Sequence, residues 1–493
     1  MIGFTTRTMA IQAAESHLLK ALGNPRFIAA PMVGQSDLAF RLLARRHGCD
    51  LAFTQMLHGK NFATVPKFRE ENFDPLSTFG GGSSEQQRQR QRHDHHEHFP
   101  PSLDRPLIAQ FCGDSPDVVV AAAKHVEGCV DAVDLNLGCP QKIARKGHYG
   151  AYLLREPDTV KRLVEGMVQG LAVPVTVKMR VLEDSHGGVE GTVAFAKMLE
   201  ACGASAVTLH GRTVKQNKNL CGACDWSAIG EVAAALSIPV VGNGGIETTR
   251  DAVSLLRTTS VAAVMSSEAL LENPGLFAPD AVATAEELFD DDHHGRGGES
   301  QSSDESDEWE DDGGDFEAKD ATAQAAVARQ LAFAREYVAL AERFPPRDEM
   351  ATVKGHCFKF LHVALERNHD VREGLVKVAS GADVVALVDE LCRRYALPTT
   401  RDTFGGGGGG GGGASSAAAG AASGGGGGIL NLHLHPHSTE GLAAIEAEAA
   451  AHVRALREAP TDAHWQAERR RRRAAGEPIA GVAERSWYRR HRR

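Results

Sequence analysis

Residues 131–152 read DAVDLNLGCPQKIARKGHYGAY, an alternation of apolar and polar residues that stops at Gly138-Cys139-Pro140. The alternation over DAVDLNL is typical of a β-strand, and the Gly-Cys-Pro sequence favours a tight turn after it. Pro140 has a fixed φ, and Gly138 tolerates backbone conformations that other residues avoid. The pattern predicts a strand whose end presents Cys139 on a stiff loop. A free cysteine is also commonly a small buried hydrophobe, and this residue alone does not separate the two interpretations.

Strand-like segments of the same kind recur on both sides of this one. The eight are FIAAPM (27–32), LAFTQM (51–56), LIAQF (107–111), DAVDLN (131–136), VPVTVKMR (173–180), AVTLHGRT (206–213), IPVVGNGG (238–245) and VAAVMSS (261–267). Amphipathic helical patterns separate most of them, such as SDLAFRLLARRHG at 36–48, where we expect Ser36 to be the N-cap. This alternation implies parallel strands joined by crossover helices. Eight complete units predict a closed (β/α)8 TIM barrel, with an open doubly wound sheet as the alternative.

Polar residues fall at the ends of most of these predicted strands. They are Gln55, Gln110, Asn136, Lys178, His210, Asn243 and Ser267. The active site of a (β/α)8 barrel lies at the carboxyl ends of its strands, so these side chains are expected to share one ring. A single polar residue at a strand end is usually a cap or a loop contact. Seven at equivalent places instead indicate a functional site.

The sequence outside the barrel is compositionally uneven. The predicted organisation is an N-terminal segment (1–24), the barrel (25–279) with a low-complexity insertion (80–98), an acidic disordered linker (280–321), a small all-helical domain (322–400), a Gly-rich linker (401–430) and a basic tail (431–493). The net charge of −10 is dominated by residues 286–320, which contain 16 acidic and two basic residues. The rest of the chain is therefore slightly basic, and its Arg-rich tail suits nucleic acid, nuclear import or simple solvation.

Three groups of residues have more than one interpretation. The second helical pattern of the 322–400 domain places Lys354, His356, Lys359 and His362 among apolar residues, as an RNA-facing edge or only a polar face. The histidines of the 80–98 insertion lack the spacing of a metal site, and Cys221 and Cys224 have no evident partner ligands, so no metal is predicted. We interpret the insertion as a solvated surface segment and the two cysteines as part of a loop near the barrel mouth.

Compartment and oligomeric state leave only weak signals in the sequence. Nine irregularly spaced cysteines favour a reducing compartment, and no apolar run approaches the roughly 20 residues that span a bilayer. We expect a cytoplasmic or nuclear monomer with no membrane association. The first 22 residues are also faintly compatible with an organelle transit peptide.

The segments APMVGQSDLAFR, LIAQF, DLNLGCPQ, VTVKMR, TLHGRT, GNGGI and MSSEALLENPGLF together resemble the tRNA-dihydrouridine synthases. The resemblance is greatest to the eukaryotic branch that acts on tRNA positions 16 and 17. It covers residues 27–277 and, more loosely, 324–397, about two-thirds of the chain. The family implies a barrel that holds FMN and uses NADPH or NADH to reduce the 5,6 double bond of uridine in tRNA.

The resemblance also assigns roles to individual residues. Cys139 would be the proton donor to uracil C5. FMN would be held by Pro31, Met32, Val33, Gln110, Lys178, His210, Asn243, Gly244, Gly245, Ser267 and Glu268. The tRNA substrate would be contacted by Asn136, Arg180, Lys142 and Arg145, with Lys146 and His148 close to the phosphate backbone. Many bacterial members have Gly-Arg where this chain has Ser267-Glu268, so one phosphate contact of those enzymes is lost here.

Chemistry gives independent support for parts of this assignment. Backbone amides at the turn Gly244-Gly245 and at the helix that follows suit a phosphate, and a lysine near flavin N1 stabilises the reduced anion. No G-x-G-x-x-G follows the first strand, which favours FMN over FAD. The alternatives are an FMN barrel acting on a small dihydropyrimidine or dihydroorotate, and a non-catalytic RNA-binding barrel. The helical domain and basic tail favour an RNA substrate.

Overall fold

The computed structural model describes residues 17–74, 101–217, 220–294, 314–346 and 350–400. These residues form two compact units. The first contains the described residues up to 294 together with 344–346 and 350–359, and the second contains 314–343 and 360–400. The predicted 80–98 insertion, Gly-rich linker and basic tail lie outside the described residues.

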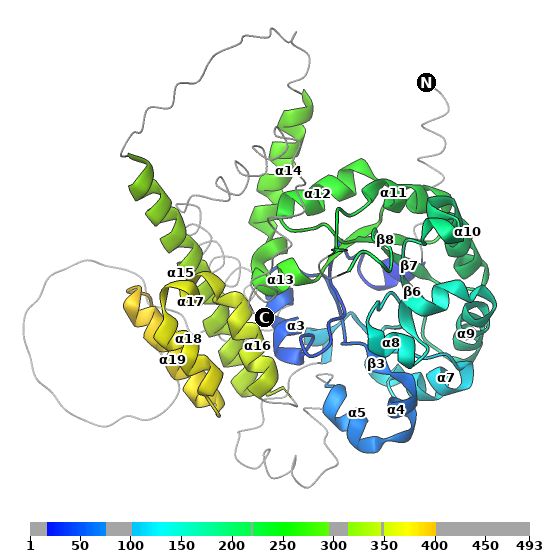
Figure 1. Cartoon of the computed structure of the whole chain (residues 1–493), viewed down its shortest axis with the longest axis horizontal. Helices are drawn as coiled ribbons and strands as arrows, with labels where there is room; N and C mark the ends of the chain where they lie inside the picture. The colour runs from blue at the N-terminus through cyan, green and yellow to red at the C-terminus, as the bar shows by residue number, and fades with distance from the viewer. Residues whose placement is uncertain (1–16, 75–100, 218–219, 295–313, 347–349, 401–493) are drawn as a thin grey trace, which may run out of the picture. The chain divides into compact units, whose positions relative to one another are not determined.

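Eight parallel strands close into a barrel in the first unit (Figure 1). They are β1 (Phe27–Ala29), β2 (Leu51–Phe53), β4 (Leu107–Cys112), β5 (Ala132–Leu137), β6 (Val175–Arg180), β7 (Ala206–His210), β8 (Val240–Asn243) and β9 (Ala263–Ser266). Consecutive strands of this set pair in parallel, β2 pairs with β4, and β1 closes the ring by pairing with β9. A two-residue strand, β3 (Leu57–His58), extends along the end of β4. The predicted (β/α)8 barrel is therefore confirmed, and the open sheet is excluded.

Amphipathic helices surround the strands. They are α3 (Leu38–Arg46), α4 (Gly59–Thr64), α5 (Pro66–Asn72), α7 (Pro116–Lys124), α9 (Pro157–Gly170), α10 (Gly188–Ala201), α11 (Trp226–Ala235) and α12 (Thr249–Thr258). Proline occupies the first turn of α7 and α9, where the missing amide hydrogen costs no helical bond. The expectation that Ser36 caps α3 is wrong. The N-cap is Asp37, which accepts from the amide of Phe40, whereas the Ser36 hydroxyl bonds the backbone at Met32 and Ala30.

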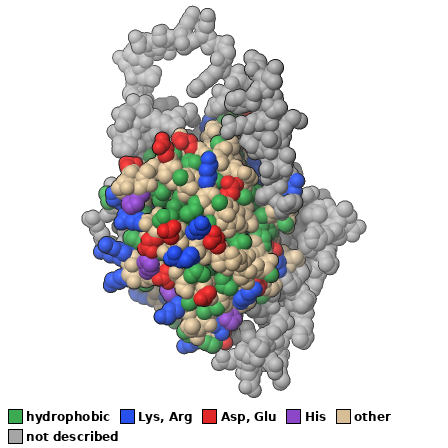
Figure 2. All heavy atoms as spheres, turned by 90° about the vertical axis from the view of Figure 1, so that its right-hand side faces the viewer, with side chains coloured by type: hydrophobic (Ala, Val, Ile, Leu, Met, Phe, Trp, Pro, Cys, Tyr) green, Lys and Arg blue, Asp and Glu red, His purple; other side chains and the backbone are tan. Residues whose placement is uncertain are grey.

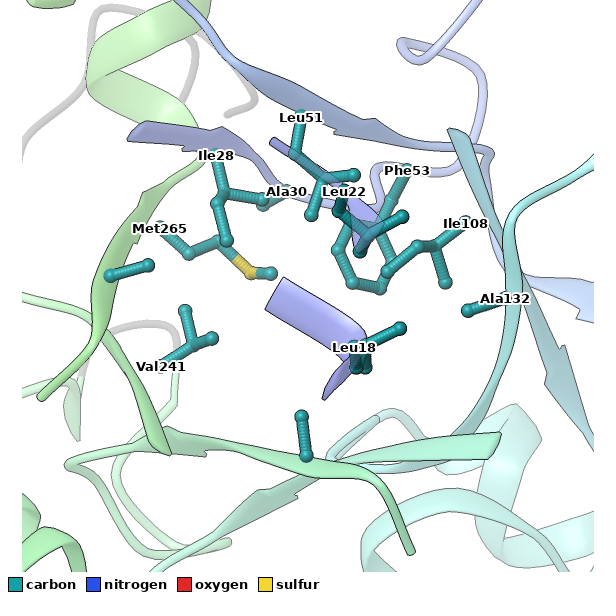
Figure 3. Packing of buried hydrophobic residues seen from close by; sticks show 12 residues of the cluster. Leu18, Leu22, Ile28, Ala30, Leu51, Phe53, Ile108, Ala132, Val241 and Met265 are labelled. Atoms are coloured by element: carbon teal, nitrogen blue, oxygen red, sulfur yellow. The ribbon is translucent and has the colours of Figure 1, made fainter. Parts of the chain in front are cut away.

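The amino-terminal end of the barrel is filled by a short helix that precedes the first strand. Leu18 of α2 (His17–Ala21) and Leu22 pack among inward-facing side chains of the strands, including Ile28, Phe53 and Met265 (Figure 3). Both leucines are less than 10% exposed. Leu18 and Leu22 therefore belong to the barrel core, although the sequence pattern predicts a separate N-terminal segment over residues 1–24.

The predicted acidic linker is helical at both of its ends. Helix α14 (Pro279–His294) follows the short helices α13 (Glu268–Glu272) and η7 (Pro274–Phe277), and it buries Val282 and Ala285. Its Glu286 carboxylate lies 2.9 Å from the Arg26 guanidinium. Apolar burial and this ion pair hold the first acidic residues in a helix that composition alone does not predict. Residues 295–313 lie outside the described residues.

The second unit is all-helical. It contains α15 (Gly314–Arg343), α17 (His362–Arg367), α18 (His369–Lys377) and α19 (Gly381–Arg394). Its core includes Tyr337 and Phe360, whose rings meet edge to face at 5.3 Å. The predicted second helix is two helices, because α16 (Met350–Phe360) ends before α17 begins. Residues 350–359 of α16 belong to the barrel unit. Among the described residues, no helix is both long and apolar enough to cross a membrane.

Candidate active site

Three side chains on β4 and β5 form a buried hydrogen-bonded chain. The Gln110 amide nitrogen donates to the Asp134 carboxylate at 2.9 Å, and the Asn136 amide nitrogen donates to the Gln110 carbonyl oxygen at 2.8 Å. The Thr176 hydroxyl on β6 donates to the second Asp134 oxygen at 2.7 Å. Each of these side chains is less than 10% exposed. Because every bond has a defined donor and acceptor, the chain fixes the Gln110 and Asn136 rotamers.

A carboxyl and an amine at this ring have pKa values that approach each other. Burial raises the pKa of Asp134 to about 6, against the hydrogen bonds from Thr176 and Gln110. Burial lowers the pKa of Lys178 on β6 to about 8, with a further contribution from the positive charge of Arg180. Near neutral pH Lys178 is therefore a cation that can lose its proton readily.

Cys139 lies on a loop that is held from three directions. The Asn136 side-chain Oδ1 accepts the backbone amides of Gly138 at 3.1 Å and Cys139 at 3.0 Å. The Arg180 Nε donates to the Gly138 carbonyl at 2.8 Å. The Cys139 carbonyl accepts the amide of Ala151 at 3.1 Å. The predicted stiff turn is present, and the Asn136 carboxamide contributes to it by shaping the loop.

The thiol of Cys139 is suited to holding a proton. Its side chain is partly buried and packs against a small apolar cluster that includes Cys112, Ala144 and Tyr149. Burial raises the pKa of Cys139, and the positive charges of Arg180 and Lys178 lower it by less. The thiol is therefore protonated at neutral pH, as a general acid requires and a nucleophilic thiolate does not.

Arg180 connects the loops that follow β5 and β7. Besides its bond to Gly138, its Nη1 donates to the Thr213 carbonyl at 2.9 Å and to the Gln216 carbonyl at 3.4 Å. Burial lowers its pKa to about 10, so the guanidinium remains charged at neutral pH. Its contact with a substrate stays a prediction.

The glycine turn after β8 has the geometry that only glycine adopts easily. Gly244 has φ +96° and Gly245 has φ +72°. A Cβ at Gly244 would lie 2.5 Å from the His210 ring. Burial lowers the pKa of His210 well below its usual range, so the imidazole is neutral. The start of α12 is already occupied by a capping box between Thr248 and Asp251, so the predicted phosphate site depends on the turn.

The remaining predicted cofactor residues lie at neighbouring strand ends. Pro31, Met32 and Val33 follow β1, whose strand partner β9 precedes Ser267 and Glu268. Ser267 is the N-cap residue of α13 and is partly buried, whereas Glu268 is exposed. Gln55 accepts the Gly34 amide at 2.9 Å and so supports the loop after β1.

The basic stretch after Cys139 divides into two groups. Lys142 and Arg145 are exposed on α8 (Lys142–Lys146) and are available to a polyanion. His148 instead bridges two carboxylates, Asp114 at 2.8 Å and Glu156 at 2.7 Å, and hydrogen bonds to them raise its pKa. The contact of His148 with phosphate stays a prediction, and the two carboxylates beside the imidazole reduce the local positive charge. On the molecular face shown in Figure 2, basic and acidic side chains are interspersed rather than gathered into one basic patch.

The Cys221 and Cys224 loop lies at the barrel mouth, as expected. Cys224 donates to the Asn243 carbonyl at 3.7 Å, and burial raises its pKa to about 11. Across the described residues there is no group of three or more His, Cys, Asp or Glu side chains that could hold a metal ion.

One known protein family has a sequence model that matches the barrel. The model of the family described as dihydrouridine synthase (Dus) matches residues 28–296, more than half of the chain. This chain belongs to the dihydrouridine synthase family. The match covers all eight barrel strands except the first residue of β1, Phe27. It contains the Cys139 loop, the hydrogen-bonded side chains around Gln110 and the glycine turn.

Curated relatives agree with the family assignment. The chain is 34% identical over 372 residues to a mouse protein named as tRNA-dihydrouridine(16/17) synthase-like, covering 76% of this chain and 62% of that protein. It is 40% identical over 274 residues to a Saccharomyces cerevisiae tRNA-dihydrouridine(16/17) synthase, covering 55% and 59%. A human protein named as tRNA-dihydrouridine(20a/20b) synthase-like is 32% identical over 254 residues, covering 51% and 70%. The chain thus spans about three-fifths of the length of the first two relatives.

Two members of the buried chain in this family site were not predicted from the sequence. Asp134 and Thr176 lie inside their strands rather than at the ends, so the pattern of polar residues at strand ends does not include them. The available signal was the period of two, because Asp134 and Asn136 point to the same side of β5. A charged residue on the inward side of a barrel strand is rarely placed there by packing alone.

Proposed function

We propose that this protein is a flavin-dependent tRNA-dihydrouridine synthase, which reduces the 5,6 double bond of a uridine in tRNA with electrons from NADPH or NADH. Membership of the dihydrouridine synthase family supports the reaction class. The observation that carries the mechanism is the Cys139 thiol, protonated and held on a fixed loop at the same strand ends as Lys178. Names of the mouse and yeast relatives favour positions 16 and 17.

The residues at the ring have the chemistry that FMN requires. Lys178 is a partly buried cation suited to the N1 and C2 carbonyl side of a reduced flavin, and Gln110 offers an amide fixed by its neighbours. The Gly244-Gly245 turn lets the backbone amides approach a phosphate. A side chain at Gly244 would displace His210 and so prevent this approach. These donors fit FMN, with Pro31–Val33 and Ser267-Glu268 completing the site.

Bound FMN, once reduced by the nicotinamide cofactor, would supply the hydride for uracil C6. The protein supplies the proton, because the Cys139 Sγ–H donates to C5 as the double bond is reduced. Its raised pKa keeps the proton on sulfur until C5 becomes basic. The loop bonds from Asn136 and Arg180 hold the thiol in place, so proton transfer begins from a near-attack geometry.

The substrate must enter the barrel mouth as an unstacked base. A uridine inside folded tRNA cannot reach the strand ends, so it has to be flipped out of its stack. Lys178 and Arg180 would bond a uracil carbonyl oxygen, and Lys142 and Arg145, which are exposed, would attract the phosphate backbone. Salt-sensitive tRNA binding is therefore expected.

A host strain without dihydrouridine tests this proposal. Its tRNA should contain dihydrouridine at positions 16 and 17 when it expresses the wild-type protein, and none when it expresses Cys139→Ala. Both purified proteins should be yellow, because the thiol is not needed for flavin binding. Unmodified tRNA from a flavin-loaded wild-type protein would refute the proposed reaction and favour a small-molecule reductase.

A further inference from the structure

One face of α16 contacts the loop after β1 and lies within the electrostatic influence of α13. Thr352, His356 and Lys359 are spaced i, i+4 and i+7, so their side chains lie on the same side of the helix. All three residues belong to the barrel unit. This arrangement differs from the predicted RNA-facing edge, because the His356 side chain is 0% exposed.

The first contact is with the loop between β1 and α3. His356 Nε2 lies 2.7 Å from the Asp37 carboxylate, and the Thr352 hydroxyl donates to the Gly34 carbonyl at 3.2 Å. The imidazole also stacks on the Phe40 ring, with centroids 4.8 Å apart. Asp37 is itself the N-cap of α3, so His356 acts on the residue where the loop becomes helix.

Several other hydrogen bonds also restrain the loop between β1 and α3. Within it, the Met32 amide donates to the Ser36 hydroxyl at 2.9 Å and the Gln35 amide donates to the Met32 carbonyl at 3.1 Å. The Gln55 side chain holds Gly34 from the barrel side, at 2.9 Å. Thr352 bonds the carbonyl oxygen of the same glycine, so α16 adds one hydrogen bond to those that restrain residues 31–36.

A second interaction of α16 is electrostatic and involves α13, the helix that follows β9. The charges of Glu268 and Glu272 on α13 act on the Lys359 ammonium and raise its pKa, against the larger lowering that burial produces. Strands β1 and β9 are paired, so the loops that follow them are neighbours at the carboxyl end of the barrel. The face of α16 therefore interacts with both loops that contain Pro31–Val33 and Ser267-Glu268.

We propose that α16 is part of the flavin site, with Thr352 and His356 as positioning residues that hold the loop after β1 in its cofactor-binding form. This inference rests on the proposed function, since it assumes that FMN is the ligand. Helix α16, which follows the acidic segment in the chain, would then help to retain the cofactor rather than contact RNA. The acidic stretch thus separates two parts of one site along the sequence.

The test is the affinity for FMN of protein from which the flavin has been removed. Binding is measured by the quenching of FMN fluorescence. Thr352→Val removes one hydroxyl with little change of shape and should raise the FMN Kd about 3- to 10-fold, the range for one hydrogen bond. His356→Asn should raise it about 10-fold or more, because the buried Asp37 carboxylate loses the imidazole that bonds it at 2.7 Å and that stacks on Phe40. At saturating FMN the kcat of both variants should return to the wild-type value.

The exposed His369 at the start of α18 provides the matched control, and His369→Ala should bind FMN as the wild type does. If His356→Asn does not fold, Thr352→Val with an unchanged melting temperature decides the question. Wild-type FMN affinity in Thr352→Val together with weakened tRNA binding would overturn the inference and restore the RNA-facing interpretation. A wild-type protein that binds no FMN would instead overturn the proposed function itself.

Discussion

Gly150→Ala should displace Cys139 without removing any group that reacts. Gly150 has φ +70°, and a Cβ there would lie 2.9 Å from the Cys139 carbonyl oxygen and 3.0 Å from the Cys139 Cβ. The left-handed backbone costs a side chain about 1–2 kcal/mol. Backbone atoms at such distances cannot rotate away, so the Cys139 loop must shift by several tenths of an ångström. Because a 1 Å misplacement can cost about 100-fold in rate, we expect dihydrouridine formation to fall about 10- to 100-fold.

The assay is the rate of dihydrouridine formation on tRNA at saturating FMN and NADPH, with FMN affinity measured beside it. Only the tRNA-dependent step should slow, while FMN Kd stays within about twofold of wild type because the cofactor residues lie on other strands. The control is Gly128→Ala, since a Cβ at Gly128 meets no atom within 4 Å. Wild-type turnover in Gly150→Ala would refute the claim that the loop geometry positions the thiol.

Three further changes test other parts of the site. Asn136→Ala removes three hydrogen bonds and should lower the unfolding free energy in urea by about 3 kcal/mol, and a loss below about 1 kcal/mol would contradict the proposed loop anchoring. Gly244→Ala should weaken FMN binding at least about tenfold because its Cβ would push against His210, as fluorescence titration would reveal. Turnover should fall as pH rises through about 8, where Lys178 loses its proton. In the unfolded chain Lys178 keeps its proton up to its ordinary pKa of 10.5, so the unfolding free energy should rise with pH between about 8 and 10.5. An unfolding free energy in urea that stays constant from pH 8 to 10 would contradict the lowered pKa of Lys178.

The barrel was predictable because its signals are local. Each strand shows its own alternation or apolar run, and each helix has a 3.6-residue period, so eight units follow from eight separate short patterns. The position of Cys139 was predictable for the same reason, since Gly138 and Pro140 are its immediate neighbours. The strand-end ring followed from the topology of the barrel alone.

What the sequence left undetermined depends on residues far apart in the chain. Leu18 fills the barrel only because the strands around it are already closed, and α16 meets Asp37 across more than 300 residues. The first end of the acidic segment is helical because Val282 is buried and Glu286 pairs with Arg26, neither of which composition records. In each case tertiary contacts override the local preference.

The central claim is that Cys139 supplies the proton during reduction of uridine in tRNA, and a single-turnover experiment tests it directly. The flavin of wild-type and Cys139→Ala proteins is first reduced with NADPH under anaerobic conditions and then mixed with dihydrouridine-free tRNA. The account predicts that both proteins are reduced at the same rate, but that only wild type is reoxidised by tRNA with one dihydrouridine formed per flavin. Reoxidation of Cys139→Ala at the wild-type rate, with dihydrouridine as product, would contradict it.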